Sequence, residues 1–141
     1  MKLVLCNGKA FFVSGTIEKI EKNVTMHISN MNGDETDGFL RFFSYNVGVV
    51  EKLFKIENGL ATISKDVLDI GDRYKVYLLS SGRESVYCGE FHIIEDPALG
   101  VCVLPVRGDV EHLWDCLTAI TEFAQTLHEK LASHINGVDI I

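Results

Sequence analysis

Residues 24–29 read Val-Thr-Met-His-Ile-Ser, so that apolar and polar side chains alternate. This period of two is typical of a β-strand with one buried face, because successive side chains of a strand point to opposite sides of the sheet. Gly38–Tyr45 carries Leu40 and Phe42 on one side and Phe39 on the other, which predicts a strand covered on both faces. The N-terminal part of the chain is therefore expected to be β-structure.

Turn signals separate further stretches of the same kind. Asn58-Gly59 lies between Leu53–Ile56 and Leu60–Ile63, which predicts a hairpin with a type I′ turn, because Asn and Gly tolerate positive φ. Tyr74–Leu79 and Ser85–Ile93 form a second predicted strand pair. About seven or eight short strands within roughly 100 residues match an immunoglobulin-like sandwich. We therefore expect a mainly β chain whose residues 1–95 form an antiparallel sandwich.

The pattern changes at Glu95–Gly100, where proline and glycine interrupt the strands. Residues 96–108 are predicted to be a linker that contains a short extended segment, Gly100–Val106. Beyond it, residues 109–141 are predicted to hold one long helix and a tail. Asp109 can cap the start of this helix and Asn136-Gly137 can end it.

The helix carries an apolar residue at every third or fourth position, the a/d pattern of a coiled coil. At about 39 Å it would exceed a sandwich about 25–30 Å across, and its leucines would face water. Such a stripe favours self-association. Its mixed a and d residues favour three or more strands, and of these we expect a trimer. The alternative is a helix folded over the sheet, with Trp114 and Phe123 widening its apolar face. The predicted oligomer interface comprises Val110, Leu113, Trp114, Leu117, Ile120, Ala124, Leu127, Leu131 and His134.

Composition narrows the class of protein. The chain has 141 residues, 47% of them hydrophobic and 23% charged, which excludes wholesale disorder and a fibrous chain. Its net charge of −7 argues against a nucleic-acid binder, which needs a basic face for phosphates. No run approaches 18 apolar residues, so we expect no membrane span.

The cysteines predict a reducing site of synthesis. Cys6, Cys88, Cys102 and Cys116 are far apart, lack zinc-binding spacing and stand among apolar neighbours, so we expect free thiols buried as small hydrophobes. Met1–Cys6 resembles the start of a lipoprotein signal, but its apolar run is too short, and a first strand is predicted instead.

The motifs of common catalytic and metal sites do not occur. His128 and His134 resemble a metalloprotease pair, but they are six positions apart, which puts them about 120° apart on a helix. His134 is instead expected either to set the register of the seam or to lie at a frayed helix end. The acidic loop Asn32–Gly38 lacks the glycine and glutamate spacing of a calcium-binding EF-hand, which leaves a solvated loop or a weak calcium site. Phosphate-loop, dinucleotide and hydrolase-elbow motifs are absent as well. We expect no catalytic residue, metal or cofactor.

Asn58–Leu68 followed by Ile70–Leu78 resembles β-sandwich modules of bacteriophage virion proteins, the N-terminal domains of baseplate and head-fibre proteins. In those modules an Ile-(Ser/Pro)-Lys turn precedes a glycine and a Tyr-rich strand. The resemblance covers residues 55–95 and the overall layout. It implies a sandwich that attaches to the particle and a helical, often trimeric, stalk. The chain shows no receptor-binding tip after the helix, which favours a decoration, adaptor or assembly role.

Two functions compete on these grounds. The first is a non-enzymatic structural component of a phage or prophage particle that is made in the bacterial cytoplasm, located in the virion and bound to other virion proteins. The second is a monomeric cytoplasmic module of a bacterial cell that binds a ligand or a protein, with its helix packed on the sheet.

Overall fold

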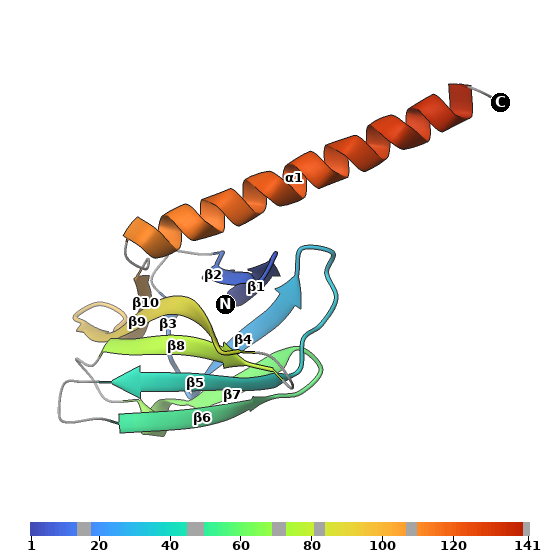
Figure 1. The fold of residues 1–141 in the computed structure, drawn as a ribbon. Helices are drawn as coiled ribbons and strands as arrows, with labels where there is room; N and C mark the ends of the chain where they lie inside the picture. Colours follow the sequence, from blue (N-terminus) through green and yellow to red (C-terminus); the bar gives the residue numbers. More distant parts are fainter. Residues whose placement is uncertain (14–17, 45–49, 69–72, 81–83, 107–109, 140–141) are drawn as a thin grey trace.

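The computed structural model describes residues 1–13, 18–44, 50–68, 73–80, 84–106 and 110–139. Within these ranges it has two β-sheets and a C-terminal helix, α1 (Val110–Asp139) (Figure 1). The four-stranded sheet has the order β2 (Lys9–Phe12), β1 (Lys2–Cys6), β4 (Asn23–Asn30), β7 (Leu60–Ser64). The six-stranded sheet has the order β3 (Glu18–Lys19), β10 (Gly100–Val106), β9 (Val86–Asp96), β8 (Arg73–Leu79), β5 (Gly38–Ser44), β6 (Val50–Ile56). A short 3₁₀ turn, Lys65–Val67, follows β7. The predicted class, a mainly β chain with one C-terminal helix, is confirmed.

Alternating side chains form the core between the two sheets. On β4, Val24, Met26 and Ile28 are all at most 4% exposed, as the period of two predicts. On β5, Leu40 and Phe42 are buried but Phe39 is 46% exposed. The expected coverage of β5 on both faces is therefore wrong at Phe39, because no described element covers the outer face of the sheet there.

Aromatic rings join the two sheets in this core. The ring of Phe42 lies 5.6 Å from that of Phe91 and 5.9 Å from that of Tyr74, measured between centroids. Phe12, from the other sheet, stacks on Phe91 at 4.5 Å. We call the ten strands with this shared core the β-body. The edge strands of the smaller sheet, β2 and β7, contact β9 and β6 of the larger one.

The Asn58-Gly59 turn forms as predicted, but the strands on either side of it separate. Asn58 has φ 51° and Gly59 has φ 71°, and Glu57 and Leu60 exchange backbone hydrogen bonds of 3.0 and 2.9 Å. Ile28 N then donates to Gly59 O at 2.8 Å, which ties the turn to β4. The chain consequently passes from β6 in one sheet to β7 in the other. The turn prediction is confirmed, whereas the hairpin ladder is replaced by a crossing between sheets.

Three predictions about the β-region need correction. Strands β1 and β4 are parallel, so the antiparallel expectation is wrong for this pair. Two strands, β2 and β3, lie between them in the chain, so no hairpin forces them to be antiparallel. The sheet orders also differ from those of a constant-type immunoglobulin domain. Gly100–Val106, expected in a linker, pairs along its whole length with β9 and also with β3, because its apolar residues complete the core.

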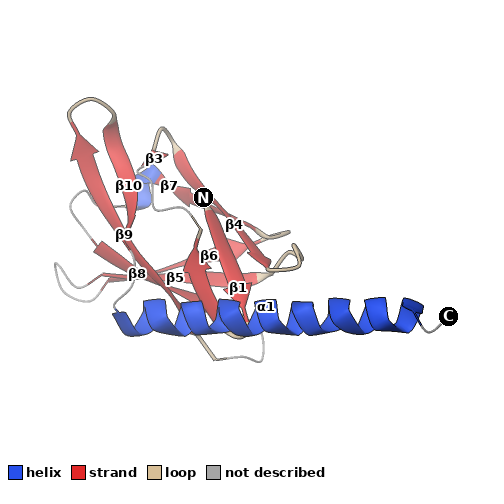
Figure 2. Ribbon diagram, turned by 90° about the horizontal axis from the view of Figure 1, so that it is seen from above, coloured by secondary structure: helices blue, strands red, loops and turns tan. Residues whose placement is uncertain are grey.

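Helix α1 has 30 residues and continues through Asn136-Gly137 to Asp139, so its predicted end is wrong. A glycine inside a helix costs only about 1 kcal/mol relative to alanine, which the last turns tolerate. The expected cap, Asp109, lies outside the described residues. The first turns of α1 lie on β1 and β2, and its C-terminal end extends beyond the strands (Figures 1 and 2). Within the described chain, no helix has the length and apolar character of a membrane span.

Candidate interaction surface on the C-terminal helix

The β1–β2 hairpin holds the first third of α1. Its two-residue turn has positive φ at Asn7 (47°) and Gly8 (79°), which places Cys6 and Asn7 under the helix. The thiol of Cys6 and the amide Nδ2 of Asn7 both donate to the backbone oxygen of Ala119, each at 3.3 Å. These two bonds fix the helix to the tip of the hairpin.

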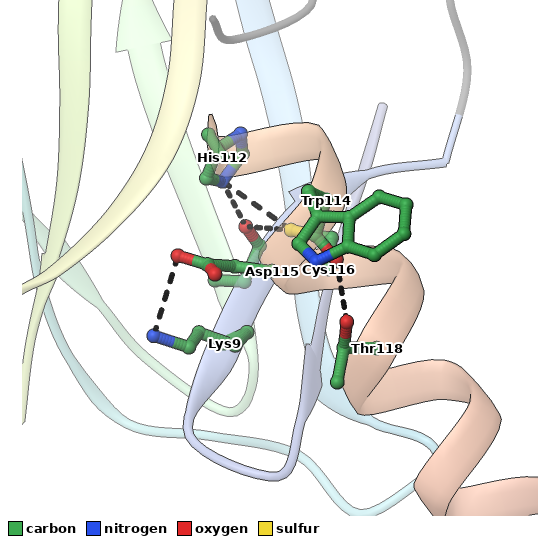
Figure 3. A network of polar contacts seen from close by, with 7 residues as sticks. Lys9, His112, Trp114, Asp115, Cys116 and Thr118 are labelled. Atoms are coloured by element: carbon green, nitrogen blue, oxygen red, sulfur yellow. Dashed lines mark hydrogen bonds and ion pairs between the residues drawn. The ribbon is translucent and has the colours of Figure 1, made fainter. Parts of the chain in front are cut away.

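A second set of contacts lies one turn earlier on the helix. Nε2 of His112 lies 3.0 Å from the backbone oxygen of Ala10, and the thiol of Cys116 donates to the same oxygen at 3.7 Å. Because a carbonyl oxygen only accepts, Nε2 of His112 carries the proton. Asp115 and Lys9 add an ion pair at 3.8 Å, and Figure 3 shows this pair on one side of the helix with the ring of Trp114 pointing away from it.

The docked face of α1 consists of small side chains. Cys116 is 5% exposed and Ala119 is 4% exposed, and no larger apolar residue of the described helix is buried to this degree. Small side chains let the helix axis come close to the hairpin backbone, which is why backbone oxygens and thiols make the contacts. The β-body therefore holds α1 without using its leucines.

The leucines of the predicted seam face solvent instead. Leu113, Leu117, Leu127 and Leu131 are 41–56% exposed, and Trp114 is 68% exposed. Leu117 follows Cys116 by one residue, which puts it about 100° around the helix from the docked face. Of the other predicted interface residues, Ile120 is half-buried and Ala124 is exposed, whereas the side chains of Val110 and His134 are not described. We call Leu113, Leu117, Ile120, Ala124, Leu127 and Leu131 the apolar stripe.

This arrangement combines parts of both expectations for the helix. The first third is packed on the β-body, as the folded-over alternative required, yet the face that packs is not the predicted one. Sequence reasoning missed His112, Cys116 and Ala119 as docking residues, because leucine spacing dominates the periodicity and small residues contribute little to it. The signal that remained was the pair Cys116 and Ala119, three residues apart on a second face of the helix.

The thiol and imidazole at the docking site do not form a nucleophilic pair. Nε2 of His112 lies 3.4 Å from the sulfur of Cys116, the i, i+4 distance on one helix face. A nucleophilic cysteine needs a lowered pKa, whereas burial and the charge of Asp115 raise the pKa of the Cys116 thiol. Burial likewise raises the pKa values of Cys6 and Cys88. All four cysteines are buried and free, as predicted, and act here as weak donors and small apolar groups.

The Asn32–Gly38 loop is organised by its own side chains. Oδ1 of Asn30 accepts from the backbone amides of Asn32 and Asp34 at 2.9 and 3.0 Å, and its Nδ2 donates to the carboxylate of Asp34 at 3.1 Å. Within the described ranges, no group of three His, Cys, Asp or Glu side chains gathers as metal ligands. The loop thus has the contacts of a solvated turn.

Comparisons with models of protein families, with curated proteins and with solved structures gave no match. The apolar stripe on α1 is the surface of the described chain whose exposure most needs a partner, because large leucines recur along one side of a helix that the β-body leaves uncovered.

Proposed function

We propose that this chain is a non-enzymatic structural or adaptor protein that self-associates through the apolar stripe of α1. The observation that carries the proposal is the exposure of Leu113, Leu117, Leu127 and Leu131 on a helix already docked through another face. Burying a leucine completely stabilises by about 1.5–3 kcal/mol, so four half-exposed leucines per copy supply a substantial driving force for association.

A place in a phage or prophage particle fits this mode of action. Support comes from the resemblance of residues 55–95 to virion modules and from the layout, a β-body followed by a helix whose end extends beyond it. In this proposal the β-body attaches to a neighbouring virion protein and α1 joins copies of the chain. A trimeric coiled coil, the stalk that the resemblance implies, is one way to bury the apolar stripe.

The docking of α1 favours a second candidate, a monomeric bacterial binding module. Four contacts from Cys6, Asn7, His112 and Cys116 make the start of the helix part of the folded unit. In this candidate the apolar stripe binds a different protein, and the chain alone in solution has the mass of one copy.

Light scattering on a size-exclusion column separates the two candidates. We expect the wild-type chain at micromolar concentration to have a multiple of the single-chain mass. Leu117→Asp and Leu127→Asp should both give the single-chain mass with an unchanged far-UV spectrum, because an unpaired charge buried in a seam costs several kcal/mol. Gln125→Asp, an exposed position beside the stripe, is the matched control and should stay associated. A wild-type chain that has the mass of one copy would refute self-association.

A further inference from the structure

We propose that the apolar stripe is covered by a second copy of α1 that runs antiparallel to the first, in a dimer with two-fold symmetry. This inference rests on the proposed self-association and specifies the direction and number of the partners. It replaces the expected trimer, whose parallel helices would stack like residue on like residue.

The spacing of the stripe is the same in both directions along the helix. Its members are separated by steps of 4, 3, 4, 3 and 4 residues. A two-fold axis perpendicular to α1 at residue 122 therefore places an a position opposite a d position in every layer. The layers, each present twice, are Leu113 with Leu131, Leu117 with Leu127, and Ile120 with Ala124 of the partner subunit.

Ala124 decides the direction. In any parallel assembly with rotational symmetry, each residue meets its own copies, so Ala124 would face only alanine and leave a void between larger layers. In the antiparallel dimer Ala124 faces Ile120 of the partner subunit, and a small side chain complements a large one. The remaining layers pair leucine with leucine, so they fit this direction without a void.

The β-body favours two copies over three. A trimer uses both edges of each seam, because every helix touches two neighbours. One edge of the stripe lies beside Cys116, which the β1–β2 hairpin already covers. A dimer needs only the opposite edge, where Trp114 is exposed and would lie near His128 of the partner subunit. The acidic side chains Glu122 and Glu129 lie about 120–140° from Leu117 and stay in solvent.

Helix dipoles add to the preference. Antiparallel neighbours place the positive end of one helix beside the negative end of the other, whereas parallel neighbours align like ends. The partner helix also clears the β-body, since the stripe is about a quarter of a turn from the docked face. The two copies of Cys116, where the hairpins hold the helices, then lie about 18 Å apart along the helix axes.

Disulfide trapping tests the direction. The single variants Leu113→Cys and Leu131→Cys are oxidised with oxidised glutathione, separately and after mixing and equilibration. We expect a covalent dimer on a non-reducing gel only from the mixture, because the two copies of residue 113 lie about 27 Å apart in the antiparallel pair. Wild-type chain, whose cysteines are buried, is the control for native thiols.

The other outcomes refute the inference in distinguishable ways. Cross-linking of Leu113→Cys to itself shows parallel helices and leaves the proposed self-association standing. A multimeric mass without any cross-link shows that the helices pair in a different register, and it also leaves the proposed self-association standing. A single-chain mass for the wild type, without cross-links, refutes both the inference and the proposed function.

Discussion

The β-body and α1 bury apolar side chains by different means. In the β-body, Phe42, Tyr74 and Phe91 are at most 1% exposed, and the ring of Phe42 packs against the other two on the inner face of the six-stranded sheet. Among the described side chains of α1, the leucines remain exposed and only Cys116 and Ala119 are buried. The difference shows that the β-body completes its own core, whereas the leucines of α1 contribute little to the stability of a single copy.

The β-body and the docked helix should also differ in the free energy needed to open them. Removing a large aromatic side chain from a core costs about 3–5 kcal/mol, whereas one hydrogen bond contributes about 0.5–1.5 kcal/mol. The docking of α1 depends on a few hydrogen bonds to Ala10 and Ala119 and on two small side chains. We therefore expect the helix to separate from the hairpin before the β-body unfolds.

Phe42→Ala should have the largest effect. This ring fills the centre of the core, so we expect the free energy of unfolding to fall by about 3–5 kcal/mol. Denaturant titration followed by far-UV circular dichroism measures the change. Phe39→Ala is the matched control on the outer face of β5, and a loss of similar size there would show that the outer face is covered after all.

Ala119→Leu should have an intermediate effect that is confined to α1. The extra methyl groups have no room against Cys6 and Asn7, and overpacking costs about 1–3 kcal/mol. We expect faster hydrogen exchange of amides 112–119 and unchanged exchange in β4 and β5. Thr118→Leu, exposed on the neighbouring face, should leave exchange as it is. Uniformly faster exchange throughout the chain would contradict separate opening of the helix.

Alkaline pH should have the smallest effect at any one thiol. Burial raises the pKa of Cys88 in the folded chain above its ordinary value of 9.0. The raised pKa therefore stabilises the folded chain fully below pH 9. Above pH 9 only the unfolded thiol loses its proton, so the free energy of unfolding falls by about 1.4 kcal/mol per pH unit for one thiol. Chemical unfolding of wild type and Cys88→Ala between pH 7 and 10.5 measures this slope. Equal slopes in the two proteins would show that Cys88 ionises in the folded state.

Local structure could be predicted from the sequence wherever one physical signal dominates. The alternation at Val24, Met26 and Ile28 predicts which face of β4 is buried, and Asn58-Gly59 predicts a turn that requires positive φ. The leucine spacing predicts both the helix and the face that carries its large side chains. In each case neighbours along the chain determine the outcome.

Pairing between distant segments could not be predicted in the same way. Alternation shows which face of a strand is buried but not which strand lies beside it. The sequence pattern therefore did not indicate the parallel pairing of β1 with β4 or the place of Gly100–Val106 in the larger sheet. The split after Asn58-Gly59 depends on the bond from Ile28 to Gly59, a contact between distant positions. For the candidate interface, the exposed leucines were predictable, but the docking through Cys116 and Ala119 was not, because small residues fit many surfaces.

The pairing of β3 with β10 has a consequence for folding during synthesis. Glu18 and Lys19 pair with Val103 and Cys102. The early strand β3 therefore cannot pair until β10, which is synthesised much later, has left the ribosome. Such long-range pairing slows folding, because a long loop must close before the contact forms. Helix α1 then docks on a hairpin made from residues 2–12, which brings the earliest and the latest segments together. We expect the apolar stripe to reach its final position last, after the strands that support it have paired.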